Sequence, residues 1–275
     1  MNIAVLMTCH NRRETTARCL ESLVQAIQNC EKLRWELFLV DDGSTDGTGE
    51  AVKRMFECSS FAEATEDRSN VLNGRVIKGN GNLYWAKGMA LAWRTALESE
   101  ASPQSQFSHF LWLNDDVELK PDALVKMLDV VRTGRSPVPT VIVGELENAQ
   151  GEIVYGTRGD LFTGNFVLVP RNAYEKIGLI CGDYHHAWAD SDYAMRCKRM
   201  GVRVESCGIV GRCEGHPNRP SLAGMSLNER WHSLFDPKGW SVHDLWLYRK
   251  RNWGFCAAIV SSLHLIFHVL RGGRR

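Results

Sequence analysis

The sequence lacks the features that mark several common protein classes. Its net charge is only +1 over 275 residues, so no global field attracts nucleic acid. The nine cysteines include no CxxC pair, and no basic segment precedes the first apolar run, so we expect reduced thiols in a cytoplasmic protein. Cys207, Cys213 and His216 lack both the paired spacing and the fourth ligand of a structural zinc site.

No apolar run is long enough to suggest a membrane span. The longest, residues 255–270, is shorter than the roughly 20 residues that a spanning helix needs, and it contains two histidines. A basic cluster, Arg249-Lys250-Arg251, and several tryptophans precede it. This tail predicts either an amphipathic helix lying on the inner face of the cell membrane or a helix packed on the rest of the chain or on a second copy.

Apolar segments that alternate with helical patterns dominate the first half of the chain. Strands are predicted at residues 3–9, 36–40, 75–78 and 110–113, and helices at 14–30, 46–57 and about 88–100. Each strand ends in small or polar residues. The pattern predicts an α/β fold with a Rossmann-like, mostly parallel sheet flanked by helices, and with ligand groups gathered at the carboxyl edge.

The pattern changes after residue 132. Strands are predicted at 140–143, 153–155 and 162–170 without full helical crossovers between the first two, which indicates a sheet extension or a small antiparallel element. A short helix follows at 171–177, and a further helix is predicted to open near residue 193.

The segment HFLWLNDDVELKPDAL, residues 109–124, ends a buried strand in Asn114-Asp115-Asp116. Neighbouring carboxylates repel each other, and a divalent cation removes that cost. Hard oxygen ligands at this position suit Mg²⁺ or Mn²⁺, which commonly bridge to phosphates. The alternative is an ordinary Asn/Asp turn.

Several motifs, taken together and in order, resemble the family 2 glycosyltransferases. VDDGSTDGT, residues 40–48, matches that family almost letter for letter, and residues 8–12 and 80–88 resemble its entry loop and its Asn-Xaa-Gly segment. Asn114-Asp115-Asp116 resembles the DxD metal motif with Asn in its first position. Ala189-Asp190 resembles the Glu-Asp base motif with Ala in place of Glu.

The resemblance implies a GT-A fold over residues 1–225, with a nucleotide-binding half at 1–118 and an acceptor half at 119–225. Residues 226–275 would form a helical extension. It further implies a metal-dependent, inverting transferase that uses a UDP- or dTDP-linked sugar and a glycan or lipid-linked acceptor. Asp190 would be the general base, with Asp192 as the fallback. Asp116 would hold Mn²⁺ or Mg²⁺ with His216 and, less directly, Asn114. The donor-binding residues would be Thr8, Asn11, Arg12, Asp42, Asn80, Lys87 and Asp115.

Other interpretations stay open from the sequence. Asn114 and Ala189 both depart from the acidic pattern, so the chain can also be a nucleotide-sugar-binding protein without catalysis. A sugar nucleotidyltransferase fits less well, because residues 8–13 contain no glycine. Acids at the start of a helix are also ordinary capping residues, and Trp85 can serve core packing rather than ligand stacking.

Overall fold

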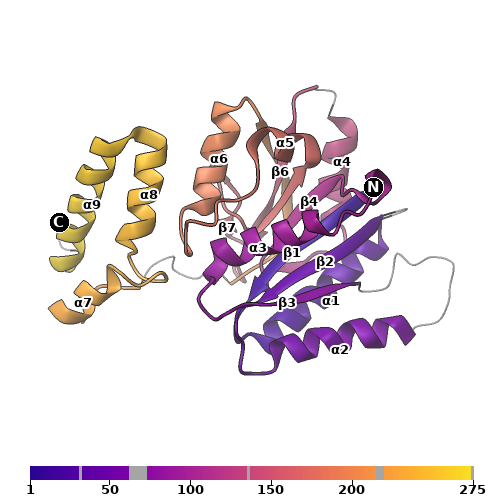
Figure 1. Ribbon diagram of the computed structural model, residues 1–275, viewed down its shortest axis with the longest axis horizontal. Coiled ribbons are helices and arrows are strands. Elements are labelled where there is room, and N and C mark those ends of the chain that lie inside the picture. The colour runs from indigo at the N-terminus through magenta and orange to yellow at the C-terminus, as the bar shows by residue number, and fades with distance from the viewer. Residues whose placement is uncertain (31–32, 62–72, 135–136, 215–219, 274–275) are drawn as a thin grey trace.

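The computed structural model describes residues 1–30, 33–61, 73–134, 137–214 and 220–273. Its first half is a parallel sheet in the order β3-β2-β1-β4, with helices between successive strands (Figure 1). The elements are β1 (Asn2–Cys9), α1 (Arg13–Gln28), β2 (Arg34–Asp41), α2 (Thr48–Phe61), β3 (Gly74–Lys78), α3 (Tyr84–Glu98) and β4 (His109–Leu113). This arrangement confirms the predicted Rossmann-like half.

The second half extends the same sheet beyond β4. Strand β10 pairs antiparallel with both β4 and β6, whereas β6 and β11 are parallel to each other. The elements are β5 (Glu118–Leu119), α4 (Ala123–Thr133), β6 (Thr140–Glu147), β7 (Ile153–Tyr155), β8 (Thr157–Arg158), β9 (Leu161–Phe162), β10 (Phe166–Pro170), α5 (Arg171–Ile177), α6 (Ala189–Arg199) and β11 (Arg203–Arg212). The antiparallel β10 and the short β8–β9 hairpin provide the sheet extension and antiparallel element that the sequence indicated.

Three helices follow the sheet: α7 (Leu227–Ser233), α8 (Val242–Trp253) and α9 (Phe255–Leu270). They enclose a small apolar core of their own that includes Leu234, Leu245 and Leu265. Helix α8 lies between α9 and α6, so the outermost element is α9 (Figure 1). Among the described residues, no helix combines the length and the apolar character needed to cross a bilayer.

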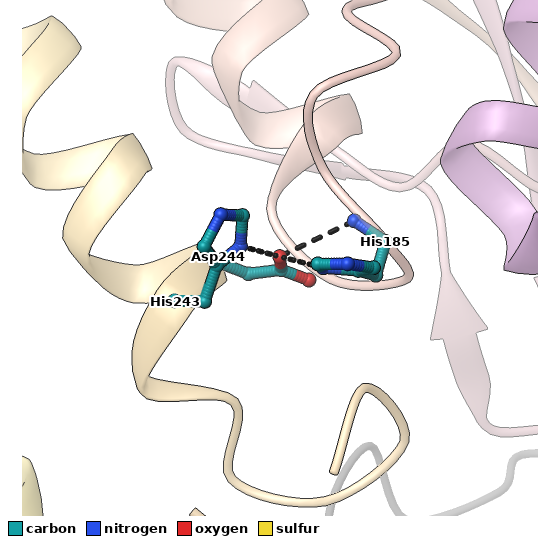
Figure 2. Close-up of side chains that lie close together, drawn as sticks. All are labelled: His185, His243 and Asp244. Carbon is teal, nitrogen blue, oxygen red and sulfur yellow. Dashed lines mark hydrogen bonds and ion pairs between the residues drawn. The ribbon is translucent and has the colours of Figure 1, made fainter. Parts of the chain in front are cut away.

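One buried carboxylate fastens this extension to the rest of the chain. Asp244, in the first turn of α8, has no exposed surface, and it accepts a hydrogen bond from the backbone N–H of His185 (Figure 2). The backbone N–H groups of His186 and Ala187 also donate to it. Trp188 stacks on Tyr248 of α8 at a centroid distance of 4.7 Å. The extension therefore contacts the loop that leads into α6.

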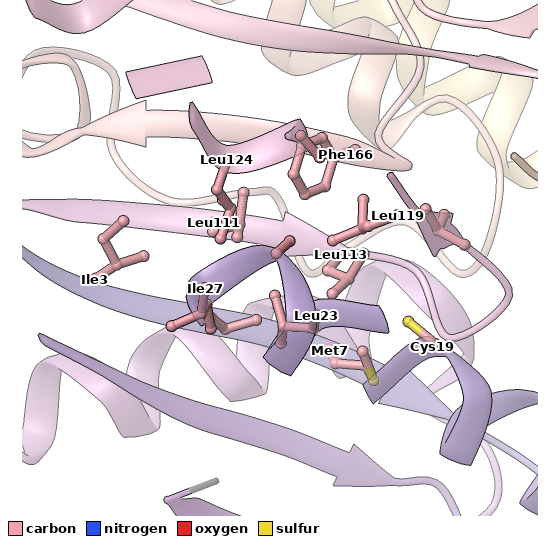
Figure 3. Close-up of a cluster of buried hydrophobic side chains, with 14 of the residues drawn as sticks. Ile3, Met7, Cys19, Leu23, Ile27, Leu111, Leu113, Leu119, Leu124 and Phe166 are labelled. Atoms are coloured by element: carbon pink, nitrogen blue, oxygen red, sulfur yellow. The ribbon is translucent and has the colours of Figure 1, made fainter. Parts of the chain in front are cut away.

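The sheet separates two apolar cores. Helices α1 and α4 cover one face, where Leu23, Leu111 and Phe166 are fully buried (Figure 3). Helices α3, α5 and α6 cover the other face, around Trp93 and Trp112. Burial of each large apolar side chain contributes on the order of 1.5–3 kcal/mol, so these two layers fix the sheet and hence the position of the loops at its carboxyl edge.

Candidate active site

Four loops meet at one edge of the sheet. They follow β1, β2, β3 and β4, which run parallel, so their carboxyl ends lie together. The loops contain residues 10–12, 42–47, 79–83 and 114–116. Most of the predicted donor and metal residues are therefore brought to one place.

Asp42 holds two of these loops together. Its side chain is 4 % exposed, and its carboxylate accepts hydrogen bonds from the backbone N–H groups of Gly81, Leu83 and Tyr84 at 2.8, 2.8 and 2.9 Å. A carboxylate in this position also complements the positive end of the α3 dipole. The sequence predicted that Asp42 contacts the base or ribose. In the structure its carboxylate lies beneath the loop that carries Asn80, whose own side chain closes a turn with Asn82 N–H, and a contact of Asp42 with the donor stays a prediction.

Asn11 and Thr8 have comparable positioning contacts. The Asn11 side-chain oxygen accepts a hydrogen bond from Thr45 N–H at 2.7 Å, and Asn11 N–H donates to Ser44 Oγ at 2.9 Å. Asn11 has a φ of 52°, a conformation that Asn tolerates better than most residues. Thr8 lies beneath Gly88 of α3, where an added Cβ would come within 2.4 Å of its hydroxyl oxygen. Asn11 and Thr8 thus fix the loops after β1 and β2 and the start of α3 relative to one another at the carboxyl edge of the sheet.

Arg12 bridges the two acids that follow β4. Its guanidinium Nη1 lies 3.1 Å from Asp115 Oδ1 and 2.9 Å from Asp116 Oδ2. Burial raises the pKa of Asp115 to about 7; Arg12 opposes that shift, and the neighbouring charge of Asp116 adds to it. The site thus concentrates negative charge that one arginine neutralises only in part.

The oxygens of the two acids are suited to a hard cation. Asp115 Oδ2 and Asp116 Oδ1 are buried, and neither accepts a hydrogen bond from a described residue. Oxygens of this kind are the ligands that Mg²⁺ and Mn²⁺ prefer. Asn114 fits less well, because its side-chain oxygen accepts a 2.7 Å hydrogen bond from Trp85 Nε1. His216 lies outside the described residues.

The end of β11 lies beside the segment that follows the acidic pair. Cys213 directly follows β11 and is buried. Burial and then the charge of Asp116 raise the pKa of the Cys213 thiol. Arg212, at the end of β11, is the register partner of Glu118, which follows Asp116 by two residues. The end of β11 therefore lies on the same side of the site as the acidic pair.

Asp190 lies in the first turn of α6, which starts earlier than predicted. Its carboxylate accepts hydrogen bonds from Gly164 N–H at 3.1 Å and Ser191 N–H at 2.7 Å. Burial raises the pKa of Asp190. A Cβ at Gly164 would lie 2.5 Å from the Trp85 ring and 3.3 Å from Asp190 Cβ, so glycine is required there for this close packing. Gly164 therefore packs against both Asp190 and Trp85, and Trp85 in turn donates to Asn114.

Asp192 has a different environment, although it is only two residues away. Its side chain is 1 % exposed, it forms a 3.1 Å ion pair with Arg196, and it accepts a 3.3 Å hydrogen bond from Asn252 of α8. These contacts join α6 to the extension. They favour a structural role for Asp192 over the fallback base that we expected from the sequence.

Lys87 and two further residues supply positive or titratable groups near the site. Lys87 is half-buried in the first turn of α3 and forms no ion pair with another described residue. His186 is exposed; the surrounding protein and then Lys238 lower its pKa, with a further contribution from Arg12. Lys238 belongs to the segment between α7 and α8. Neither His186 nor Lys238 was predicted; the only signal in the sequence is the His-His pair just before Asp190.

A cavity of about 560 Å³ lies elsewhere, at the opposite edge of the sheet. Its lining includes His109, Thr140 and Arg203, the first residues of β4, β6 and β11. Ligands of open α/β sheets bind at the carboxyl ends of strands, so we do not assign the active site to this cavity.

The fold and this edge define a class of protein. A parallel nucleotide-binding half-sheet, an acidic pair after β4 and a carboxylate at the start of α6 are those of a GT-A glycosyltransferase. Residues 4–189 match the profile of glycosyl transferase family 2. The chain belongs to that family, as its motifs suggested. Comparison with curated proteins finds no significant match.

Solved structures support the same fold. The mannosyltransferase PcManGT from Pyrobaculum calidifontis, in complex with GDP-Man and Mn²⁺, has a TM-score of 0.57 and 17 % identity, over 95 % of this chain and 74 % of that one. S. aureus TarS 1–349 in complex with UDP-GlcNAc has a TM-score of 0.59 and 13 % identity, over 98 % and 82 %. At these identities the similarity establishes the fold alone.

Proposed function

We propose that this family 2 member is a metal-dependent, inverting glycosyltransferase. It moves a sugar from a UDP- or dTDP-linked donor to a hydroxyl of a glycan or lipid-linked saccharide in cell-surface polysaccharide synthesis. The proposal depends most on Asp190, whose carboxylate accepts hydrogen bonds from two backbone N–H groups, one of them that of Gly164. Gly164 packs closely against Trp85, whose indole N–H donates to Asn114 beside the acidic pair. This chain of contacts supports a base and a diphosphate site within one active site.

The chain's own residues divide the work of an inverting displacement. The acceptor hydroxyl attacks the anomeric carbon while Asp190 accepts its proton, and the bond to the nucleoside diphosphate breaks. Burial favours proton uptake by Asp190, because it raises the pKa of that carboxyl. Arg12 lies where its guanidinium can bind the diphosphate or can offset the repulsion between the two carboxylates.

Asp115 and Asp116 would hold the divalent metal through their unpaired buried oxygens, with His216 as a further ligand. When bound, such a metal neutralises negative charge on the leaving diphosphate. The PcManGT structure contains Mn²⁺, which supports the choice of Mn²⁺ or Mg²⁺.

A donor panel tests the proposal. We expect the full-length protein with Mn²⁺ to bind UDP or dTDP by calorimetry, and to bind it more tightly than GDP, ADP or CDP. The TarS complexes with UDP and UDP-GlcNAc support a uridine-type donor. Failure to bind any nucleoside diphosphate in the presence of Mn²⁺ or Mg²⁺ would remove the proposed function.

The extension presents an apolar surface, and we propose that it contacts the membrane that carries the acceptor. Four side chains of α9, four residues apart, form its exposed stripe: Phe255, Ile259, Leu263 and Phe267 are 59, 38, 62 and 55 % exposed. Val260 adds 67 % exposure beside them. Arg271 borders this stripe, with its guanidinium 4.1 Å from the Phe267 ring centroid, and the exposed Lys250 lies near the end of α8, five residues before Phe255. Apolar area beside positive charge suits an anionic lipid surface.

Vesicle binding measures this contact. We expect the protein to sediment with vesicles that contain phosphatidylglycerol more than with neutral ones, and the binding to weaken with salt. The double variant Val260→Glu/Leu263→Glu should lower partitioning by at least about tenfold, because each side chain loses its apolar burial and gains charge. Ile153→Glu is the matched control, since Ile153 is 54 % exposed on β7, far along the chain from α9.

Self-association through the same stripe would be the alternative. A dimer in solution that the double variant dissociates, with no binding to either vesicle type, would replace the membrane contact with a homo-oligomer interface.

A further inference from the structure

Three side chains from two distant segments meet where the extension joins the rest of the chain. They are His185, in the loop before α6, and His243 and Asp244, in the first turn of α8. Within the described residues, they are the only group of three or more His, Cys, Asp or Glu side chains close enough to hold one metal ion, and their ligand atoms all lie within 4.8 Å of one another (Figure 2).

The carboxylate of Asp244 is held in a fixed orientation. It is fully buried; its Oδ2 accepts hydrogen bonds from His186 N–H at 3.2 Å and Ala187 N–H at 3.3 Å, and its Oδ1 accepts one from His185 N–H at 3.2 Å. Backbone donors of this kind are the outer contacts that orient a metal-binding carboxylate. Oδ1 faces the two imidazoles (Figure 2).

The two imidazoles converge on that same oxygen. His185 Nδ1 and His243 Nδ1 lie 3.1 and 3.0 Å from Asp244 Oδ1, and the ring centroids are 4.8 Å apart. The edge of His185 also packs against Tyr84 at the start of α3. The side chain of His243 is 56 % exposed, so an ion in solution can reach the group. Two nitrogens and one oxygen therefore surround a point that is open on one side.

We propose that His185, His243 and Asp244 form a binding site for a transition-metal ion of the Zn²⁺ class. Two imidazole nitrogens and one carboxylate oxygen favour Zn²⁺, Co²⁺ or Ni²⁺ over Mg²⁺, which prefers oxygen ligands alone. On binding, each ring carries its proton on Nε2 and turns the lone pair of Nδ1 to the ion; any extra proton goes to solvent. Water fills the fourth position. This site is separate from the acids at Asp115 and Asp116.

The position of the site gives the ion a structural effect. The His185 carbonyl accepts a 3.0 Å hydrogen bond from Ala86 N–H at the start of α3, and Asp190 follows His185 by five residues. A metal that joins His185 to α8 would therefore restrain the loop that leads to Asp190 and fasten the extension to it. Binding to the folded chain alone also raises the melting temperature.

Cobalt provides the probe. The full-length protein is freed of metal with a chelator, dialysed, supplied with Mg²⁺ and UDP to occupy the acidic pair, and titrated with Co²⁺. We expect one Co²⁺ per chain, with the visible absorption of a four- or five-coordinate ion, and a rise in Tm of roughly 5 °C with Zn²⁺ at a hundredfold excess over its Kd.

Variants assign the ligands. His243→Ala and His243→Asn should weaken Co²⁺ binding by more than about 100-fold. Loss of a residue that only supports a ligand already costs about 10–100-fold in metal affinity, and loss of a direct ligand should cost more. The asparagine variant can still donate a hydrogen bond to Asp244, so it separates loss of a ligand from loss of the contact. His232→Ala is the matched control, because His232 is exposed on α7 of the same extension.

Two outcomes would overturn the proposal: no Co²⁺ or Zn²⁺ bound to the wild-type protein under these conditions, or equal binding by His243→Ala and wild type. Neither readout depends on sugar transfer, so the result stands apart from the proposed function.

Discussion

Replacement of Asp190 by asparagine is expected to lower the rate of sugar transfer by about 10²–10⁴-fold, the usual contribution of a positioned general base. Asparagine keeps the size of the side chain and can still accept the hydrogen bond from Gly164 N–H, but it cannot take up the acceptor proton. Donor binding should change little, because the acidic pair and Arg12 remain. Initial rates and calorimetric titration with UDP or dTDP measure the two effects separately.

Two neighbouring acids provide the controls. Asp183→Asn should keep near wild-type rates, since the Asp183 side chain is 71 % exposed and its contacts, a 3.5 Å ion pair with Arg251 and a 3.5 Å hydrogen bond from Cys181 Sγ, are long. Asp192→Asn should lower thermal stability more than turnover, because it weakens a buried ion pair with Arg196. If Asp192→Asn abolished turnover in folded protein and Asp190→Asn did not, the roles of these two acids would be reversed.

Loss of the divalent metal is expected to reduce transfer by about 100-fold or more, comparable to the loss of a main stabilising group for the leaving charge. Chelation with EDTA and the variant Asp116→Ala should both produce this loss, and added Mn²⁺ should restore only the chelated wild type. In Asp116→Ala one of the two unpaired buried oxygens is gone. The measurement is the initial rate against Mn²⁺ concentration.

Glu118→Gln is the matched control for that variant. Glu118 also follows β4 and is ion-paired with an arginine, Arg18, but its side chain is 57 % exposed, so its replacement should have little effect. Full activity of the chelated wild type would show that Arg12 and the other cations suffice without a metal.

The parallel half of the fold was predictable because its information is local. Strands β1 and β4 are continuous buried runs followed by polar turn residues, and helices have a buried face of their own, as Leu20, Leu23 and Ile27 show for α1. The antiparallel pairing of β10 was not predictable in the same way, because its partners β4 and β6 are far away along the chain. Residues 226–275 were expected to be helical, but the bounds of α8 were not predicted, because its surface is basic and only a few residues, such as Leu245 and Tyr248, are buried.

In the candidate site, too, local motifs were predictable and contacts between distant residues were not. Motif resemblance singled out Asp190, Asp115 and Asp116, and their roles stay predictions. The order of the strands brings Asp115 and Asp116 to the carboxyl edge of the sheet, beside Arg12. Asp42 and Asp192 accept hydrogen bonds from residues 39 to 60 positions away along the chain, and no periodicity reveals such contacts. The contact between His185 and Asp244 is of the same kind.

The pH dependence of kcat/KM in the wild type and in Asp190→Asn tests the central claim most directly. Because burial raises the pKa of Asp190 above that of an ordinary aspartate, and only the deprotonated carboxylate accepts the proton, wild-type activity should fall as the pH decreases through that raised pKa. In Asp190→Asn, kcat/KM should be low at every pH and should not show this fall on the acid side. The same acid limb in both proteins, or a wild-type rate in the variant, would show that another group takes the acceptor proton.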